Sequence, residues 1–303
     1  MSLYRWITNT LAIALCMLLF AAVPAEADKR ITVGGKNFTE QYILASFAKI
    51  LLEENGFRVN MRTGVGSSVA RQALEHGQID VYFEYTGTAY TVFHDQDDAD
   101  VMSDADKVYE WVKDADEQKD LVWLDPLKFN NTYTLLMREQ DAEELGIESI
   151  SDLSGFMKEN PGRLTIGVNA EFWERPDGFR PLMELYDFTV PHRRIRRMDS
   201  GLVYSALRDE SVDVSMGFAT DGRIAAFGFV ILEDNLNYFP TYNPAPVVYR
   251  ETLEAYPELR EIFKPLAEKL TTEDMQELNA RVDLENEDEE RVARQWLEEN
   301  GLI

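Results

Sequence analysis

Seven aromatic, basic and hydroxyl side chains share one kind of location, because each lies at the end of a predicted strand or in a connecting loop. They come from segments far apart in the chain: Lys36, Tyr85, Thr88, Tyr133, Arg175, Phe218 and Tyr242. Taken singly, each has an ordinary explanation, since a half-buried tyrosine packs its ring and a loop cation caps a helix or points to water. The set of seven is what indicates a site, in which ring faces and unpaired cations bind a small ligand.

The other motifs do not indicate a nucleotide, metal or catalytic site. The segment Gly64-Val65-Gly66-Ser67-Ser68 lacks the third glycine of a dinucleotide fingerprint and the lysine of a Walker loop, so it favours a tight turn into a helix. His76, His94 and His192 fit no metal-ligand spacing, and Cys16 is the only cysteine. No serine stands in a nucleophile elbow. We therefore expect no catalytic residue, no metal and no cofactor, and predict that the protein is not an enzyme.

Two runs of charge have a simpler interpretation. Residues 192–197 read HRRIRR and form the one basic island of an acidic chain, whereas residues 95–106 are strongly acidic. Charge runs usually face water, so the basic run is interpreted as a solvated strand edge in preference to a docking patch, and the acidic run as a solvated face.

Composition limits the class of protein. Lys plus Arg number 30 against 55 Asp plus Glu, a formal net charge of −25. Nucleic-acid binders need clustered basic residues that displace counterions, so a nucleic-acid partner is not expected. A chain that is 45% hydrophobic and 11% aromatic is too rich in core residues to be disordered, and 303 residues indicate about two domains.

The N-terminus has the pattern of an export signal. Arg5 is followed by an apolar run over residues 11–23, and Ala25-Glu26-Ala27 places small residues where a signal peptidase cleaves. The apolar run is shorter than the roughly 20 residues that span a bilayer. The sequence therefore predicts a cleavable signal peptide over residues 1–27 and a mature protein located in the periplasm.

Strands and helices alternate along the first part of the mature chain. Residues 31–33 predict a strand, Thr39 starts an apolar helical pattern that stops at Asn55, residues 57–61 alternate as a second strand does, and residues 79–85 form a third. This order indicates a parallel sheet covered on both faces. Ligands of such sheets bind at the carboxyl ends of the strands, here the loops at 34–39, 64–67 and 85–90.

A second α/β unit occupies residues 131–235. It is followed by a proline-rich loop over residues 239–246 and then by helical patterns up to residue 299. A terminal helical segment has no sheet of its own, so we expect it to pack on the first unit. The predicted domains are thus lobe one, residues 28–130 plus 236–303, and lobe two, residues 131–235.

Several motifs in this order resemble the substrate-binding proteins of ABC transporters for glycine betaine and related quaternary amines. They are GGKNFTEQYILA (34–45), DVYFEYTGTAY (80–90), ERPDG (174–178), GFATDGR (217–223) and the final GLI. The resemblance implies an α/β, two-lobed periplasmic-binding-protein fold of type II-like architecture, with the ligand in the cleft between the lobes. It also implies a membrane permease and an ATPase as partners of a monomeric binding protein.

The resemblance also implies roles for the seven side chains. In that family an aromatic box surrounds the ammonium group, which here corresponds to Tyr85, Tyr133, Phe218 and Tyr242. The ligand carboxylate falls to Lys36, Thr88 and Arg175. The family commonly has tyrosine at the position of Phe218.

The charges of this site bear on the choice of ligand. As unpaired cations, Lys36 and Arg175 make the site locally positive, which favours a betaine carboxylate over choline, because choline would leave both cations without an anion. Choline, carnitine or another small solute remains the alternative in the same fold. An exported enzyme and an adhesion module are the alternatives of other classes.

Overall fold

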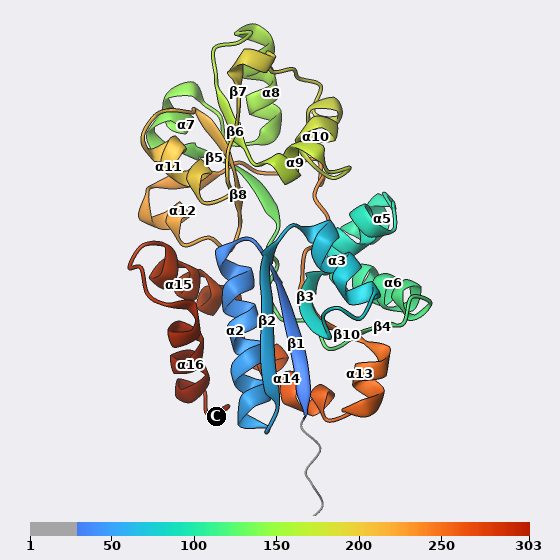
Figure 1. Cartoon of the computed structure of the whole chain (residues 1–303). Helices are drawn as coiled ribbons and strands as arrows, with labels where there is room; N and C mark the ends of the chain where they lie inside the picture. The colour runs from blue at the N-terminus through green and yellow to red at the C-terminus, as the bar shows by residue number, and fades with distance from the viewer. Residues whose placement is uncertain (1–28) are drawn as a thin grey trace, which may run out of the picture.

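The computed structural model describes residues 29–303, which form two lobes, each built around a five-stranded sheet (Figure 1). The strands of the first lobe are β1 (Arg30–Lys36), β2 (Arg58–Val65), β3 (Val81–Tyr85), β4 (Leu121–Trp123) and β10 (Pro244–Tyr249). Those of the second lobe are β5 (Tyr133–Arg138), β6 (Ile166–Val168), β7 (Ile195–Arg197), β8 (Val214–Phe218) and β9 (Phe229–Ile231). The strand orders are β2-β1-β3-β10-β4 and β7-β6-β8-β5-β9. The predicted two-lobed α/β architecture is confirmed.

Helices cover both sheets. In the first lobe they are α2 (Thr39–Glu54), α3 (Ser67–Glu75), α4 (Thr86–Thr88), the π-helical turn η1 (Ala89–Phe93), α5 (Ala99–Met102), α6 (Ala105–Glu117), α13 (Arg250–Ala255), α14 (Leu259–Lys269), α15 (Thr272–Asp283) and α16 (Glu289–Glu299). In the second lobe they are α7 (Glu139–Leu145), α8 (Ile150–Glu159), α9 (Ala170–Glu174), α10 (Phe179–Leu185), the 3-10 turn η2 (His192–Arg194), α11 (Leu202–Arg208) and α12 (Arg223–Ala226). The segment at 64–68 is the predicted turn into a helix, since β2 ends at Val65 and α3 begins at Ser67.

The predicted parallel pairing is confirmed for β1, β2 and β3, but each sheet also contains antiparallel strands and is therefore mixed. Strand β10 pairs antiparallel with β3 and β4, and β5 pairs antiparallel with β8 and β9. The register explains the direction: the first residue of β10, Pro244, faces Tyr85 at the end of β3, and Tyr133 at the start of β5 faces Phe218 at the end of β8. Strand β10 thus begins beside the end of β3, and β5 begins beside the end of β8.

Part of the predicted proline-rich loop belongs to the central strand β10. The carbonyls of Pro244 and Pro246 accept hydrogen bonds from the backbone of Leu127 and Leu124. In an antiparallel strand the N–H and C=O of one residue point to the same side, so the N–H groups that these prolines lack would also point there. The regular pairing with β4 ends at Trp123, before it reaches either proline. The strand therefore loses no ladder hydrogen bond to β3.

The C-terminal helices pack on the first lobe. Helices α14, α15 and α16 contact α2, whose apolar stripe is buried as the sequence predicts. Trp296 of α16 packs edge-on against Phe47 of α2, with ring centroids 5.3 Å apart. Residues from the end of the chain therefore lie beside α2, the helix that follows β1. Figure 1 shows these segments as adjacent red and blue ribbons.

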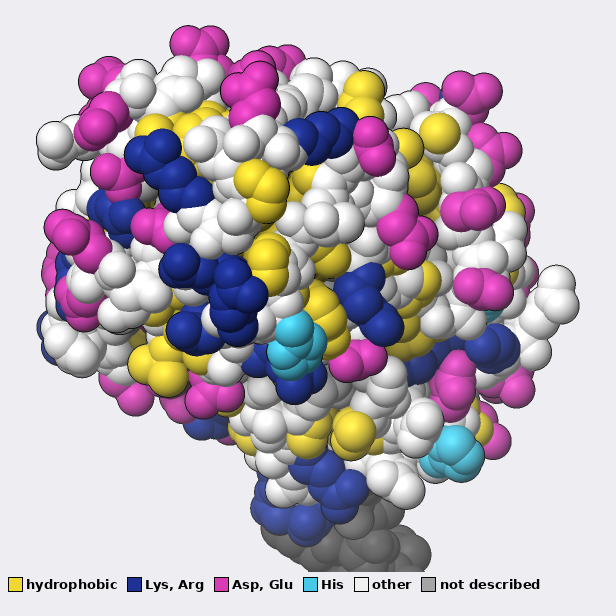
Figure 2. Space-filling view, turned by 90° about the horizontal axis from the view of Figure 1, so that it is seen from above, with side chains coloured by type: hydrophobic (Ala, Val, Ile, Leu, Met, Phe, Trp, Pro, Cys, Tyr) yellow, Lys and Arg dark blue, Asp and Glu magenta, His cyan; other side chains and the backbone are white. Residues whose placement is uncertain are grey.

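The basic run lies at a sheet edge. Strand β7 is an outer strand of the second sheet and pairs only with β6, and Arg193, Arg196 and Arg197 are exposed. Figure 2, which views the molecule from the side of this lobe, shows basic side chains gathered on one part of the face and acidic ones spread around it. The basic run therefore lies on an exposed strand edge, and its interpretation as a solvated edge in preference to a docking patch stays a prediction.

The predicted signal peptide, residues 1–27, lies outside the described residues. Within residues 29–303, no helix has the length and apolar character needed to cross a membrane.

Candidate functional site

A single pocket between the two sheets is lined by all seven side chains of the predicted site, together with polar neighbours that include Ser67, Asn131 and Glu171. The elements explain the convergence. Lys36, Tyr85 and Phe218 are the last residues of β1, β3 and β8, Tyr133 is the first of β5, Thr88 ends α4, Arg175 follows α9, and Tyr242 precedes β10. Strand ends from both lobes therefore meet at one edge, as open α/β sheets require.

The aromatic side of the pocket is a cluster of rings in contact with one another. Tyr133 lies 5.0 Å from Phe218 and 5.7 Å from Tyr242 between ring centroids, and it stacks on Phe172 at 4.7 Å. Tyr85, Tyr133 and Tyr242 are almost fully buried. Rings presented by two sheets surround one volume, and their electron-rich faces suit a cation that has no N–H to donate.

A fifth ring, Phe38, belongs to this cluster and was missed in the sequence. It stands at the N-cap of α2 and is half-buried. Its ring lies nearly parallel to those of Phe218, at 5.3 Å, and Tyr85, at 6.1 Å. Phe38 therefore connects the Tyr85 ring of the first lobe with the Phe218 ring of the second. Its position in the 34–39 loop, beside Lys36, was the available signal.

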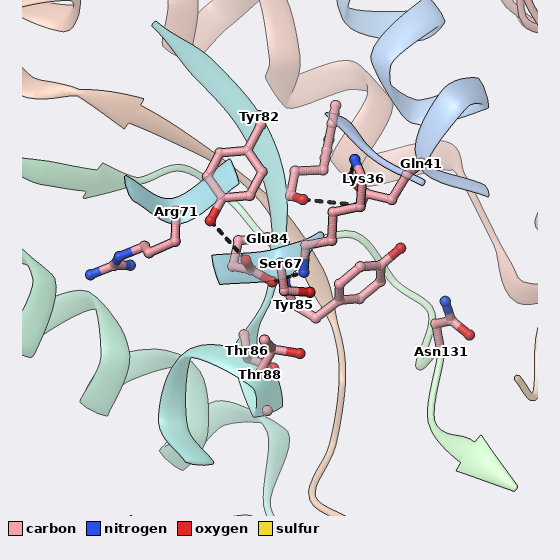
Figure 3. A network of polar contacts seen from close by, with 12 residues as sticks. Lys36, Gln41, Ser67, Arg71, Tyr82, Glu84, Tyr85, Thr86, Thr88 and Asn131 are labelled. Atoms are coloured by element: carbon pink, nitrogen blue, oxygen red, sulfur yellow. Dashed lines mark hydrogen bonds and ion pairs between the residues drawn. The ribbon is translucent and has the colours of Figure 1, made fainter. Parts of the chain in front are cut away.

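Lys36 is already paired. Its Nζ lies 2.5 Å from Oε1 of Glu84, and both side chains are buried (Figure 3). Glu84 also accepts a hydrogen bond from the hydroxyl of Tyr82 at 2.7 Å. The Lys36 ammonium lies 4.9 Å from the centre of the Tyr85 ring, so the cation is held against the aromatic cluster by an anion behind it.

Arg175 is paired in the same way. Its Nε and Nη2 donate to the two carboxylate oxygens of Asp177 at 2.7 and 2.6 Å, and both residues are buried. The guanidinium also donates to Thr88 Oγ1 at 3.3 Å and lies 5.1 Å from the centre of the Tyr133 ring. Burial would raise the pKa of Asp177, but the Arg175 charge together with hydrogen bonds from Arg175, Tyr242 and Thr91 holds that pKa below its usual range.

The expectation of unpaired cations in a locally positive site is therefore wrong. Glu84 and Asp177 neutralise Lys36 and Arg175, and a third carboxylate, Glu171, lies 3.3 Å from Arg175. Burial alone would raise the pKa of Glu171. The nearby charges of Arg175 and Lys36 oppose this effect, and the pKa of Glu171 is below its usual range. Both Glu84 and Asp177 stand inside the motifs EYTGT and ERPDG. The sequence showed their presence, but a buried ion pair between a β1 residue and a β3 residue depends on the strand register.

Metal chemistry has no support in the described chain. Within residues 29–303, no three His, Cys, Asp or Glu side chains are grouped as metal ligands would be. His94 contacts the buried Asp116 through Nε2 at 2.7 Å, outside the pocket, and His76 and His192 are exposed.

Comparison with known proteins places this pocket in context. The family model described as "Substrate binding domain of ABC-type glycine betaine transport system" matches residues 29–299. A glycine-betaine-binding protein of Pseudomonas aeruginosa is 43% identical over 97% of this chain and 96% of its own length. The glycine betaine-binding protein YehZ of Escherichia coli is 32% identical over 95% of this chain and 96% of its own length. A crystal structure titled as a glycine betaine/carnitine/choline ABC transporter has a TM-score of 0.72 at 27% identity, over 90% of this chain and 99% of that one.

Proposed function

Because the chain belongs to the family of substrate-binding domains of ABC-type glycine betaine transport systems, as its motifs predict, we propose that it captures glycine betaine in the described pocket. Members of this family work with a permease and an ATPase and act outside the cytoplasm. For this chain we propose a monomeric, non-enzymatic carrier that releases its ligand to such a permease.

The observation that carries the proposal is the convergence of seven side chains from both sheets on one pocket. We assign Tyr85, Tyr133, Phe218 and Tyr242, with Phe38 as a fifth ring, to the trimethylammonium group. A quaternary ammonium cannot donate a hydrogen bond, so ring faces are its natural receptor, at about 0.5–2 kcal/mol per ring. Several such contacts suffice for micromolar binding, which requires about −8 kcal/mol.

We assign the ligand carboxylate to Lys36, Thr88 and Arg175. An ammonium has three N–H donors, and Lys36 uses one of them on Glu84, so two remain for the ligand. Arg175 directs its five donors to Asp177, Thr88 and Glu171, so a ligand carboxylate takes the donors that now point to Thr88 and Glu171. The ligand carboxylate then joins existing ion pairs and adds no isolated charge. The ligand carboxylate contributes to binding mainly through directional hydrogen bonds. Charge neutralisation contributes less than it would if Lys36 and Arg175 were unpaired.

The same pairing keeps choline as a second candidate. Since Lys36 and Arg175 have their own carboxylates, a ligand without an anion leaves neither cation uncompensated. Carnitine carries both an ammonium group and a carboxylate and is the third candidate. Parallel calorimetric titrations with glycine betaine, choline and carnitine rank them, and we expect glycine betaine to bind most tightly.

Ring removal in the pocket tests the proposed site. Tyr133→Leu retains an apolar side chain but removes the ring face, and we expect it to weaken glycine betaine binding at least about tenfold. The matched control is Tyr256→Leu, because Tyr256 also packs against a phenylalanine, Phe57 at 5.1 Å, but lies outside the pocket. If the two variants bind glycine betaine equally tightly, the described pocket is not the binding site.

We further propose that the lobes comprise residues 28–130 plus 236–303 and residues 131–235, and that residues 1–27 direct export and are cleaved. The grouping of β1 to β4 with β10, and of β5 to β9, supports these boundaries. The intact mass of protein recovered from the periplasm tests the cleavage, because retention of residues 1–27 would contradict it.

A further inference from the structure

A buried carboxylate, Glu40, lies directly behind the aromatic side of the pocket. Glu40 is in the first turn of α2 and is only 3% exposed. Its Oε1 accepts a hydrogen bond from the Tyr85 hydroxyl at 2.8 Å and another from the Asn131 amide at 2.8 Å. Glu40 lines a neighbouring cavity and not the ligand pocket, so it acts on the ligand through Tyr85 and Asn131, which both line that pocket.

The other carboxylate oxygen reaches the opposite lobe. Oε2 accepts a hydrogen bond at 2.5 Å from the hydroxyl of Thr220, which lies in the loop after β8. Asn279 of α15 contacts the same oxygen at 3.5 Å and donates to the Thr220 carbonyl at 3.0 Å. Glu40 therefore lies where the lobes meet. Moving the lobes apart would remove Thr220 and expose the carboxylate to water.

The closed arrangement holds one acceptor too many for an ionised Glu40. Thr220 has a single hydroxyl proton, yet its oxygen lies within bonding distance of both Glu40 Oε2 and Asn131 Oδ1, at 2.5 and 3.0 Å. Asn279 Oδ1 is buried and has no hydrogen-bond partner among the described residues. A proton on Glu40 Oε2 solves the first conflict, because it is donated to Thr220, whose own proton is then free for Asn131.

The surrounding charges do not stabilise the ionised form. On the second lobe, Arg223 is paired with Asp221 at 2.6 Å and with Asp283 of α15 at 3.1 Å. On the first sheet, Lys36 is paired with Glu84. Burial raises the pKa of Glu40 to about 7, although its hydrogen bonds to Thr220, Tyr85, Asn279 and Asn131 lower it.

We propose that Glu40 is a positioning residue that links ligand capture at Tyr85 to closure of the second lobe, and that closure takes up one proton at this carboxyl. The inference rests on the proposed function, because it requires a ligand that holds the two lobes together. With the lobes apart, the hydrated carboxyl has an ordinary pKa of about 4.3. The closed form therefore binds the proton more tightly, so ligand affinity increases as pH falls from about 7 towards 4.5 and is constant at higher pH.

Calorimetric titration of glycine betaine at pH 5.5 and pH 8 tests the coupling. We expect the unaltered protein to bind at least about tenfold more tightly at pH 5.5, and the heat to vary with the ionisation enthalpy of the buffer because a proton is taken up. Glu40→Gln mimics the protonated carboxyl, since its amide can donate to Thr220. This variant should bind at both pH values with the low-pH affinity and without proton uptake. Glu53→Gln, on the exposed end of α2, is the matched control and should keep the original pH profile.

Two outcomes overturn the inference while the proposed function stands: equal affinity of the unaltered protein at both pH values, or an unchanged pH profile in Glu40→Gln. Absence of any binding of glycine betaine, choline or carnitine would instead contradict the proposed function.

Discussion

At the scale of single residues, the pocket is made of groups that are satisfied before any ligand arrives. Lys36 and Arg175 each have a buried carboxylate partner, and the Tyr242 hydroxyl donates to Asp177 at 2.5 Å. Such pairing fixes the rotamers of long side chains, whose ordering would otherwise reduce the binding free energy. Specificity therefore depends on where the remaining donors and ring faces point.

Phe38 provides a residue-scale prediction. Phe38→Leu keeps an apolar side chain between Tyr85 and Phe218 but removes the ring face, so glycine betaine affinity should fall by about two- to thirtyfold. Calorimetry measures the change. Phe156→Leu is the control, since Phe156 is also half-buried and lies outside the pocket, and its affinity should stay unaltered. If Phe38→Leu binds as tightly as the unaltered protein, Phe38 only packs against its neighbours.

At the scale of elements, a buried ion-pair cluster joins α3, α6 and β4. The Asp116 carboxylate accepts two hydrogen bonds from the Arg71 guanidinium, at 2.7 and 2.5 Å, and one from the Trp123 indole at 2.7 Å. Burial would raise the pKa of Asp116, but the hydrogen bonds from Arg71 and His94 hold it well below its usual range. The carboxylate thus stays ionised inside the lobe.

Asp116→Asn tests this cluster. The amide leaves the Arg71 charge buried without an anion, so the free energy of unfolding should fall by about 3–5 kcal/mol. Because the folded-state pKa of Asp116 is depressed, its contribution is present above about pH 4 and is lost as pH falls further, and the difference between the two proteins should narrow there. Denaturant titrations between pH 3 and 7 measure it. Glu110→Gln, exposed on the same helix, should show no such difference.

Elements were more predictable than their pairing. The strand and helix order of the first lobe and the terminal helices followed from periodicity, because a core-facing residue must repeat with the period of its element. Strand β10 was missed because Pro244 and Pro246 argue against a central strand unless the end of β4 is known. The seven site residues followed from strand ends and family motifs. The pairing of Lys36 with Glu84 required the strand register, whereas Asp177 and Phe38 stand two residues from Arg175 and Lys36 and had a sequence signal.

At the scale of the whole molecule, ligand contacts from both lobes predict compaction. A ligand that touches rings and donors on both sheets stabilises the closed arrangement over any open one. We expect glycine betaine to reduce the radius of gyration in small-angle scattering. Tyr133→Leu at the same ligand concentration is the control and should show a weaker change. An unchanged radius at saturation would contradict closure around the ligand.

The net charge of −25 also belongs to this scale. It does not steer a zwitterion, which has no net charge, and salt screens such fields within about 8 Å. Since the pocket cations are paired, the acidic surface surrounds a site that is not positive. The acidity is best understood as a contribution to solubility.

The position of β10 has a consequence for how the protein is made. This strand lies between β3 and β4, yet it follows the entire second lobe in the chain. The first sheet therefore lacks a central strand until residues near 249 have been synthesised. Pairings of such large sequence separation form slowly. During synthesis the first lobe therefore stays incomplete until β10 has been made, after the whole second lobe.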